Sequence, residues 1–153
     1  MGANPPSVAG MRVTSPAFGY GRRIPLRFTC DGEDLSPPLV IHDLPAGTIS
    51  LTLVMEDPDV AGGTWVHWVL FDLPPLDEIP EGVRDLGTPG ANSWRRIGYG
   101  SPCPPTGIHR YLYRVYALDD TLRLPERSGI TEVLAAMEGH ILGDAVLMGR
   151  HGQ

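Results

Sequence analysis

The sequence is poor in cysteine and lacks long apolar runs. Only Cys30 and Cys103 occur among its 153 residues, and they do not form a Cys-x-x-Cys pair, so we expect reduced thiols and no disulfide-built scaffold. No segment approaches the roughly 18 consecutive apolar residues that span a bilayer. Residues 1–11 also lack the charged start and apolar centre of a signal peptide. These absences argue against a transmembrane segment, and we expect a cytoplasmic protein.

Positive charge is also in short supply. The chain carries 12 basic and 18 acidic residues, which gives a formal net charge of −6. Proteins that bind nucleic acids usually show a basic stripe and a high isoelectric point. Nucleic acid is therefore not an expected partner.

Glycine and proline, by contrast, are abundant, with 19 and 16 residues. Neither suits the interior of a helix, and proline is excluded from central strands, so the chain should be rich in turns and short strands. Apolar residues make up 42% of the chain and charged residues 20%, as in ordinary globular domains. We expect residues 1–12 to form a flexible N-terminus and residues 13–153 to form a single, mostly β domain.

Hydrophobic periodicity predicts where the strands lie. Alternation at residues 49–55 predicts a half-buried strand with Ser50 and Thr52 on the open face, whereas residues 64–73 are apolar on both faces, as in a fully buried strand. The longest strand is expected at residues 108–118, with His109, Tyr111 and Tyr113 on one face. Shorter strands are predicted at residues 26–29, 39–41 and 145–148. Residues 94–97 are expected either to form a short strand or simply to cover the core. Residues 74–92 are too irregular for an element of their own.

One amphipathic helix is predicted near the C-terminus. Ile130, Val133, Leu134, Met137 and Ile141 follow the spacing of a helix with one apolar face. Gly143 is placed to end it.

Polar residues gather around the ends of the predicted strands. Asp57 and Asp59 follow the strand at residues 49–55, and His67 lies near the start of the next strand. His109 and Tyr111 share one face of the strand at residues 108–118. Each residue has a simpler explanation taken alone: an aspartate can cap a turn, a histidine can be a satisfied core residue, and a tyrosine can pair across strands. Together they predict a small binding pocket.

The chemistry of this group favours an anionic ligand. Imidazole and phenol groups donate hydrogen bonds to phosphate oxygens, and the backbone of the Gly100-Ser101 loop can supply an anion-binding nest. The carboxylates would keep a neighbouring imidazole protonated or hold an amine of the ligand. The ligand class expected is therefore a small anion or a phosphorylated zwitterion.

Catalytic and metal sites are less well supported. No two histidines fall at the short spacing that places zinc ligands on one element. There is no Gly-x-Ser-x-Gly elbow, no phosphate-binding P-loop and no dinucleotide fingerprint, and no base is assigned to Ser101 or Cys103. We therefore expect no enzyme activity, no cofactor and no metal, and keep as an alternative a hydrolase that uses His67 or His109 as general acid or base.

Several motifs, taken in order, resemble the phosphatidylethanolamine-binding protein family, also called Raf kinase inhibitor-like proteins, in its short bacterial and archaeal form. The resemblance covers nearly the whole chain from Thr14 to Gly149. The motifs are Ser15-Pro16-Ala17-Phe18, Thr29-Cys30-Asp31-Gly32-Glu33, Ser36-Pro37-Pro38-Leu39, Pro45-Ala46-Gly47-Thr48, Glu56-Asp57-Pro58-Asp59, Val66-His67-Trp68, Gly98-Tyr99-Gly100, Pro102-Cys103-Pro104-Pro105 and His109-Arg110-Tyr111.

This resemblance implies both a fold and a site. The fold would be a two-sheet antiparallel β-sandwich, Greek-key-like, with one or two short helices. The ligand-binding residues would be Asp57, Asp59, His67, Gly100, Ser101, Pro104, His109 and Tyr111. The family's binding and regulatory roles make a protease or a kinase the alternative partner, contacted through a surface loop such as residues 74–92. The oligomeric state is left open between monomer and homodimer.

The sequence departs from the family pattern at several places near the site. Val60-Ala61-Gly62-Gly63 replaces the usual Ala-Pro after the acidic loop, which predicts a more flexible rim. Ile41 replaces a common tryptophan, and Ser101 replaces a usual glycine. The chain has no room for the extra C-terminal helix of animal members, so we expect a more open pocket. Because both cysteines lie in motif loops, a disulfide between them is the alternative to reduced thiols.

Overall fold

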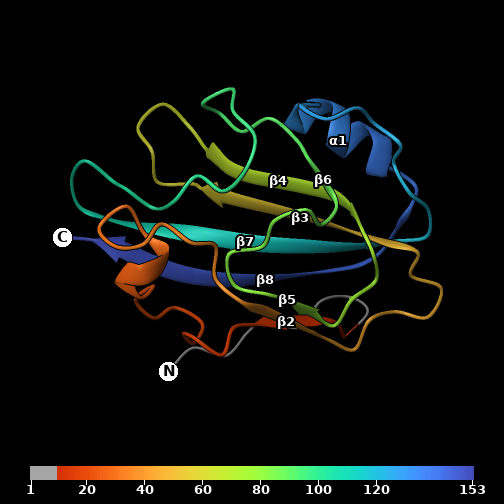
Figure 1. The fold of residues 1–153 in the computed structure, drawn as a ribbon, viewed down its shortest axis with the longest axis horizontal. Coiled ribbons are helices and arrows are strands. Elements are labelled where there is room, and N and C mark those ends of the chain that lie inside the picture. The colour runs from red at the N-terminus through yellow and green to blue at the C-terminus, as the bar shows by residue number, and fades with distance from the viewer. Residues whose placement is uncertain (1–9) are drawn as a thin grey trace.

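The computed structural model describes residues 10–153, which form two antiparallel sheets (Figure 1). The larger sheet contains, in spatial order, β6 (Thr88–Pro89), β4 (Trp65–Leu73), β3 (Ser50–Asp57), β7 (Ile108–Leu118) and β8 (Ile141–Gly152). The smaller sheet contains β1 (Arg12–Thr14), β2 (Leu39–His42) and β5 (Glu78–Ile79). A short 3-10 helix, η1 (Leu26–Phe28), and one α-helix, α1 (Ile130–Met137), complete residues 10–153. The predicted two-sheet fold with a helix near the C-terminus is confirmed.

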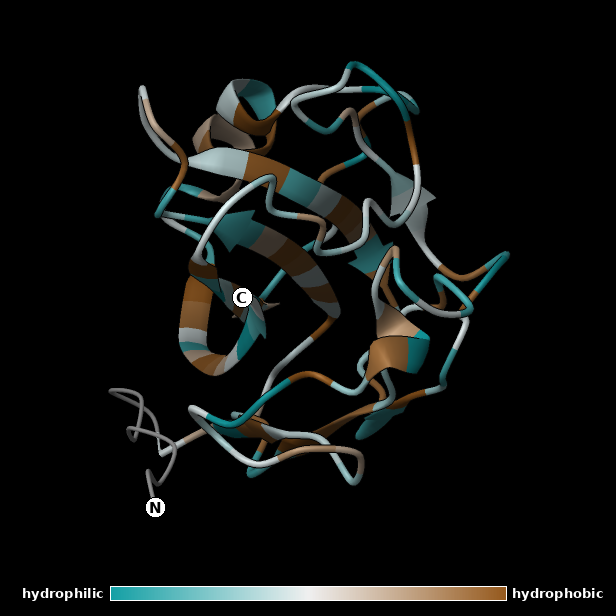
Figure 2. Cartoon of the chain, turned by 90° about the vertical axis from the view of Figure 1, so that its left-hand side faces the viewer, coloured by the Kyte–Doolittle hydropathy of each residue, from teal (hydrophilic) through white to brown (hydrophobic). Residues whose placement is uncertain are grey.

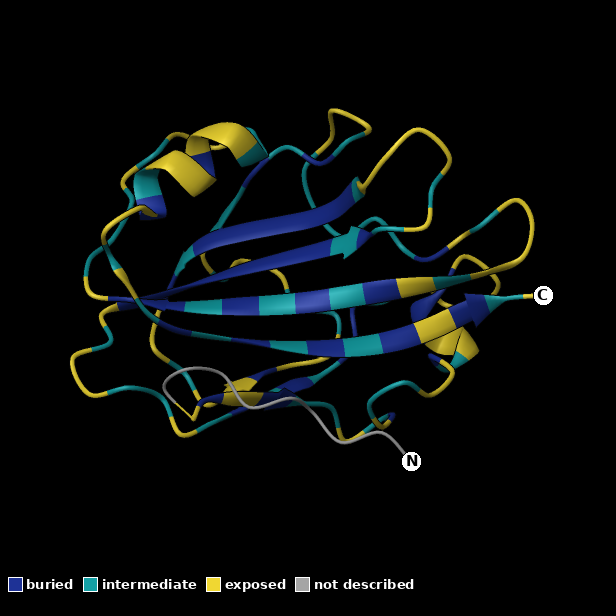
Figure 3. Ribbon diagram, turned by 180° about the vertical axis from the view of Figure 1, so that it is seen from behind, coloured by how far each residue is buried: buried dark blue, intermediate teal, exposed yellow. Residues whose placement is uncertain are grey.

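The larger sheet has a hydrophobic cluster on each face. The first packs Leu51, Leu53 and Met55 of β3 against residues of the smaller sheet such as Val13 and Ile41. The second lies on the opposite face, where Val54 and Phe71 meet Val133 and Met137 of α1. Figure 3 shows the result: β3 and β4 are buried along most of their length, whereas β7 and β8 alternate mainly between buried and partly exposed positions.

The sequence explains these patterns. β3 and β4 are rich in Val, Leu and aromatic residues on both faces, as expected for strands that are covered on both sides. β7 alternates, with Tyr111, Tyr113 and Val115 turned toward the core. The hydropathy colouring of Figure 2 shows the same banding along the strands.

The strand predicted at residues 26–29 does not form, and of the two alternatives for residues 94–97 the strand is excluded. The strand predicted at residues 49–55 is buried on both faces, where half-burial was expected. Residues 26–28 form η1, not a strand. Residues 94–97 form turns, in which Asn92 Oδ1 accepts hydrogen bonds from the backbone N–H groups of Trp94 (3.0 Å) and Arg96 (3.1 Å). β3 is buried on both faces, because the smaller sheet packs against one face and α1 against the other. Ser50, on the second face, donates to the Asp120 carbonyl (2.6 Å). Ile49, expected in this strand, lies outside it and is exposed.

The helix is shorter than predicted and the last strand is longer. α1 ends at Met137, and Gly139 adopts a positive φ of 83° that reverses the chain. Ile141 and Gly143 therefore belong to β8 and not to the helix. Residues 74–92, expected to be irregular, contain the two-residue strands β5 and β6.

The N-terminal boundary also differs from expectation. A flexible segment was predicted at residues 1–12, of which residues 1–9 lie outside the described part of the chain. Met11 is fully buried and Arg12 begins β1, pairing with His42, so ordered structure starts before residue 13. No helix within residues 10–153 is long and apolar enough to cross a bilayer.

Candidate functional site

The polar residues singled out in the sequence come together at one end of the larger sheet. β3 ends at Asp57, which pairs with Trp65 at the start of β4, and β7 lies on the other side of β3 in antiparallel register. Because all three strands are antiparallel neighbours, the end of β3 and the starts of β4 and β7 meet at one edge. Asp57, His67, His109 and Tyr111 are therefore close in space although up to 54 residues apart in sequence.

Asp57 is the centre of this group. The residue is only 2% exposed, and its Oδ2 atom accepts a 2.6 Å hydrogen bond from His109 Nδ1. The other oxygen, Oδ1, accepts from the backbone N–H of Asp59 at 2.8 Å. A buried carboxylate needs such partners to offset the loss of water, so the pair with His109 fixes the orientation of the imidazole.

His67 is held by the loop that precedes β7. The ring is 4% exposed, and its Nδ1 atom donates to the Gly100 carbonyl at 2.7 Å, while the Gly100 N–H donates back to the His67 carbonyl at 3.0 Å. Burial lowers the pKa of His67 below its usual value, although the nearby carbonyl of Gly100 and the charge of Asp57 act in the opposite direction. At neutral pH, His67 is therefore an uncharged imidazole whose Nε2 atom remains for a ligand.

Tyr111 lies between the two histidines. Its ring centroid is 5.3 Å from that of His67, edge to face, and 6.5 Å from that of His109, nearly parallel. Burial, and next the negative charge of Asp57, raise the pKa of Tyr111. The phenol thus stays protonated and can serve as a hydrogen-bond donor.

Asp59 stabilises the loop beside the site, because its carboxylate is bound to Arg110. Its carboxylate binds Arg110 through three hydrogen bonds of 2.8 to 3.0 Å, from the backbone N–H and from the guanidinium. The side-chain hydrogen bond from Arg110 lowers the pKa of Asp59 to about 2. Asp59 therefore ties the loop after β3 to the start of β7.

Gly100, Ser101 and Pro104, the loop residues predicted for the site, occupy three different positions. A side chain at Gly100 would collide with the Trp94 ring and the His67 carbonyl, because a Cβ atom would lie 2.3 and 2.8 Å from them. Glycine is thus required where this loop meets β4. The backbone of Ser101 lies close enough to His67 to affect its pKa. Pro104 lines a neighbouring cavity of about 620 Å³, together with Arg23, Asp31 and His151.

Two features of the site were not predicted as part of it. Trp94, 42% exposed, meets the His67 ring edge to face at a centroid distance of 4.8 Å and also contacts Trp65. The sequence predicted a short strand or a cover over the core at residues 94–97, and not a contact with His67. Trp94 forms an apolar wall beside His67. Its neighbour Trp65 has a buried indole N–H that finds no hydrogen-bond partner among residues 10–153.

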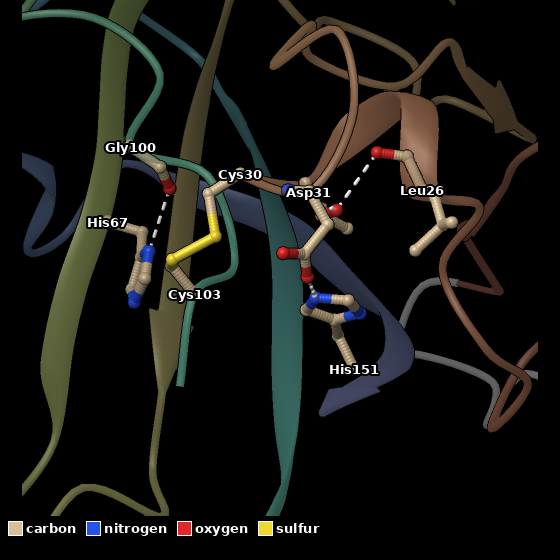
Figure 4. Close-up of a disulfide and its surroundings, with 8 residues drawn as sticks. Leu26, Cys30, Asp31, His67, Gly100, Cys103 and His151 are labelled. Atoms are coloured by element: carbon tan, nitrogen blue, oxygen red, sulfur yellow. Dashed lines mark hydrogen bonds and ion pairs between the residues drawn. A yellow bond between two sulfur atoms is a disulfide. The ribbon is translucent and has the colours of Figure 1, made fainter. Parts of the chain in front are cut away.

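The second feature is a disulfide between Cys30 and Cys103, with a Cα–Cα distance of 5.5 Å. It corrects the expectation of two reduced thiols. Figure 4 shows the bond between two histidine pairs: His67 with Gly100 on one side, and His151 with Asp31 on the other. The motifs predicted that each cysteine lies in a loop. They did not predict that the loop after η1 meets the loop before β7.

Within residues 10–153, no three His, Cys, Asp or Glu side chains gather closely enough to form a metal site. The geometry instead presents two imidazoles, a phenol and a buried carboxylate beside an aromatic wall. Such a set can exchange hydrogen bonds with a small polar group.

Comparison with known proteins assigns this β-sandwich to a known protein family. A family model described as phosphatidylethanolamine-binding protein matches residues 14–152. The chain belongs to this family, as its motifs indicated.

Relatives and solved structures agree with that assignment. UPF0098 proteins of Chlamydia muridarum and Methanothermobacter thermautotrophicus are each 45% identical to the chain, over 151 and 146 residues. These matches cover 94% and 91% of this chain, and 99% and 97% of the relatives. The structure of a putative phosphatidylethanolamine-binding protein homologue from Chlamydia trachomatis is 42% identical, with a TM-score of 0.90 over 94% of this chain and 97% of that one. E. coli YbcL, described as a member of the mammalian family, shares the fold at 24% identity, with a TM-score of 0.84 over 94% of this chain and 98% of that one.

Proposed function

We propose that the chain is a binding protein that captures a small anionic or phosphorylated group between His67, His109 and Tyr111. The observation that carries the proposal is the buried Asp57 carboxylate, which holds His109 by its Nδ1 atom. In the imidazolium form, His109 then has its Nε2–H group left for a ligand, and an anion at this position stabilises that form. Tyr111, held protonated by burial and by Asp57, adds a neutral hydroxyl to the site.

The polar contacts favour an anion over a cation. Both carboxylates of the group already accept hydrogen bonds, Asp57 from His109 and Asp59 from Arg110. An ammonium group on the ligand therefore has little to gain from them. We expect phosphate and O-phosphoethanolamine to bind with similar affinities.

Isothermal titration with these two compounds tests the proposal. Saturable binding is expected, and His109→Ala should weaken it by about tenfold or more, because a hydrogen bond to a charged group is lost. The matched control is His140→Ala, since His140 makes the same kind of contact with Asp119 (2.8 Å) at an exposed position. Unchanged affinity in His109→Ala, or equal losses in both variants, would show that the site assignment is wrong.

A second candidate is regulation of a protease or a kinase through residues 74–92. This segment exposes Pro74, Pro75 and Pro80, and its residues 82–87 line a cavity of about 550 Å³. Inhibition of a chymotrypsin-like protease, assayed with a chromogenic peptide, would have to persist in His109→Ala and disappear when residues 74–77 are replaced by a Gly-Ser linker. Loss in His109→Ala, or no inhibition by the unaltered chain, would contradict it.

A further inference from the structure

Three arginines lie side by side at the same end of the larger sheet, on its outer surface. Arg110 of β7 is the antiparallel partner of Arg150 of β8, and Arg150 forms a parallel bridge with Arg23. Directly paired residues project their side chains from the same face of a sheet. The next residue of β8, His151, is buried, whereas all three arginines are exposed. The three guanidinium groups therefore emerge together on the solvent face.

Two of these charges have no counter-charge. Arg110 is neutralised by Asp59, but among the ion pairs of residues 10–153 none involves Arg23 or Arg150. Residues 1–9 contain no aspartate or glutamate. Within residues 10–153, the Arg23 guanidinium donates to the Gly152 carbonyl at 3.4 Å. Asp31, which lines the same cavity, is bound to His151.

This arrangement is unfavourable for the isolated fold. Like charges directly opposite one another on neighbouring strands destabilise a sheet. The chain has more acidic than basic residues, so a carboxylate could have been placed beside these arginines. The absence of an internal carboxylate at Arg23 and Arg150 is thus a feature that folding does not explain. An external anion would remove the repulsion.

The surroundings of the arginines are hollowed and partly apolar. Arg23 and His151 line two cavities, one of about 240 Å³ shared with Arg150 and Ile108, the other of about 620 Å³ shared with Leu26. Ile108 and Leu26 are 55% and 59% exposed. Two uncompensated charges are thus flanked by two exposed apolar side chains.

From this geometry we propose that Arg23, Leu26, Ile108 and Arg150, named the arginine surface below, bind an extended acidic segment of a partner protein. Carboxylates of the segment would pair with Arg23 and Arg150, and an apolar residue would cover Ile108 or Leu26. All twelve basic residues of the chain are arginines, whose planar guanidinium binds carboxylates in a bidentate manner. A small anion would leave the apolar residues uncovered. A flat anionic membrane would bring many negative charges close to the rest of this acidic chain, whose net charge is −6, whereas an extended segment contacts only the arginine surface.

A fluorescein-labelled peptide that alternates glutamate and leucine is a suitable probe. Fluorescence anisotropy at low ionic strength should detect binding that falls as salt is added. Arg23→Gln/Arg150→Gln should weaken this binding about fivefold or more, because two exposed ion pairs with the same peptide are lost. A peptide with glutamine in place of glutamate should not bind.

The matched control is Arg12→Gln/Arg127→Gln, which removes the same charge from exposed positions elsewhere. It should retain full binding, as should His109→Ala, since the arginine surface does not depend on the anion site. Equal losses in the two double variants would contradict the proposal, and so would failure of the peptide to bind the unaltered chain. Arg23- and Arg150-dependent binding to phosphatidylserine vesicles without binding to the peptide would reassign the surface to membranes. Thermal unfolding of Arg23→Gln/Arg150→Gln should show no loss of stability, because a repulsion is removed.

Discussion

At the scale of single residues, the two histidines of the site are held in different ways. His109 donates to a buried carboxylate and His67 to a backbone carbonyl. Only the first partner carries a charge, so the protonation of His67 depends mainly on its burial. Trp94 and Tyr111, which contact its ring edge to face, contribute to that burial.

This difference predicts a pH dependence of anion binding. The pKa of His67 is lowered by burial, so the residue is neutral at pH 7 and gains a proton, a positive charge and an Nε2–H donor as the pH falls. Sulfate affinity should therefore rise as the pH falls below about 6.5, the usual histidine pKa, because the pKa of His67 lies lower still. Sulfate is the suitable probe because its own charge does not change in this range. Titration calorimetry at several pH values measures the effect.

His67→Asn separates this contribution from that of His109. The asparagine amide can still donate to the Gly100 carbonyl but cannot be protonated. The rise in affinity should be smaller in this variant than in the unaltered chain. An identical pH profile in both proteins would mean that His67 does not contact the anion.

At the scale of elements, long patterns were more predictable than short ones. β4 and β7 were correctly located because many consecutive residues in each follow one pattern. Residues 26–28 were mistaken for a strand because three residues carry no period, and Pro25 leads into a 3-10 turn. Ile141 matched the helical spacing although Gly139, at a positive φ, already ends that segment. Periodicity does not detect such a reversal.

The candidate site could be predicted in part for the same reason. Motif resemblance singled out Asp57, His67, His109 and Tyr111, and the structure brings these four together. Their pairing required the strand order β4-β3-β7, which no local pattern contains. The contact of Trp94 with His67 depends on the turns after Asn92, and the pairing of Arg110, Arg150 and Arg23 depends on the register of β8. These features come from tertiary structure.

At the scale of the whole molecule, the Cys30–Cys103 disulfide connects parts of the chain that are 73 residues apart. It joins the loop after η1, where Asp31 holds His151, to the loop before β7, where Gly100 holds His67. The Cys30 N–H also donates to the Pro102 carbonyl at 3.2 Å. The covalent bond thus stabilises the loops beside both the anion site and the arginine surface. Both cysteines are exposed, so a soluble reductant has access to them.

Loss of this bond should destabilise the protein and weaken the anion site. Closing a loop of this length restricts the unfolded chain and contributes on the order of 4 kcal/mol in the entropic model, with typical values of about 2–4 kcal/mol. Cys30→Ser/Cys103→Ser should therefore lower the melting temperature by roughly 5–15 °C, as measured by circular dichroism. Phosphate affinity should also fall, because Gly100 would be held less firmly against His67.

Reduction of the unaltered chain provides the matching experiment. Dithiothreitol should produce the same shift in melting temperature and should leave the Ser/Ser variant unaffected, which separates loss of the bond from the effect of the serines. If the reduced chain shows two titratable thiols but an unchanged melting temperature, the bond does not contribute to stability. A thiol count on protein trapped by alkylation in intact cells then tests the expected cytoplasmic location. Disulfides rarely persist in a reducing cytosol, so recovery of the intact bond would favour an oxidising compartment.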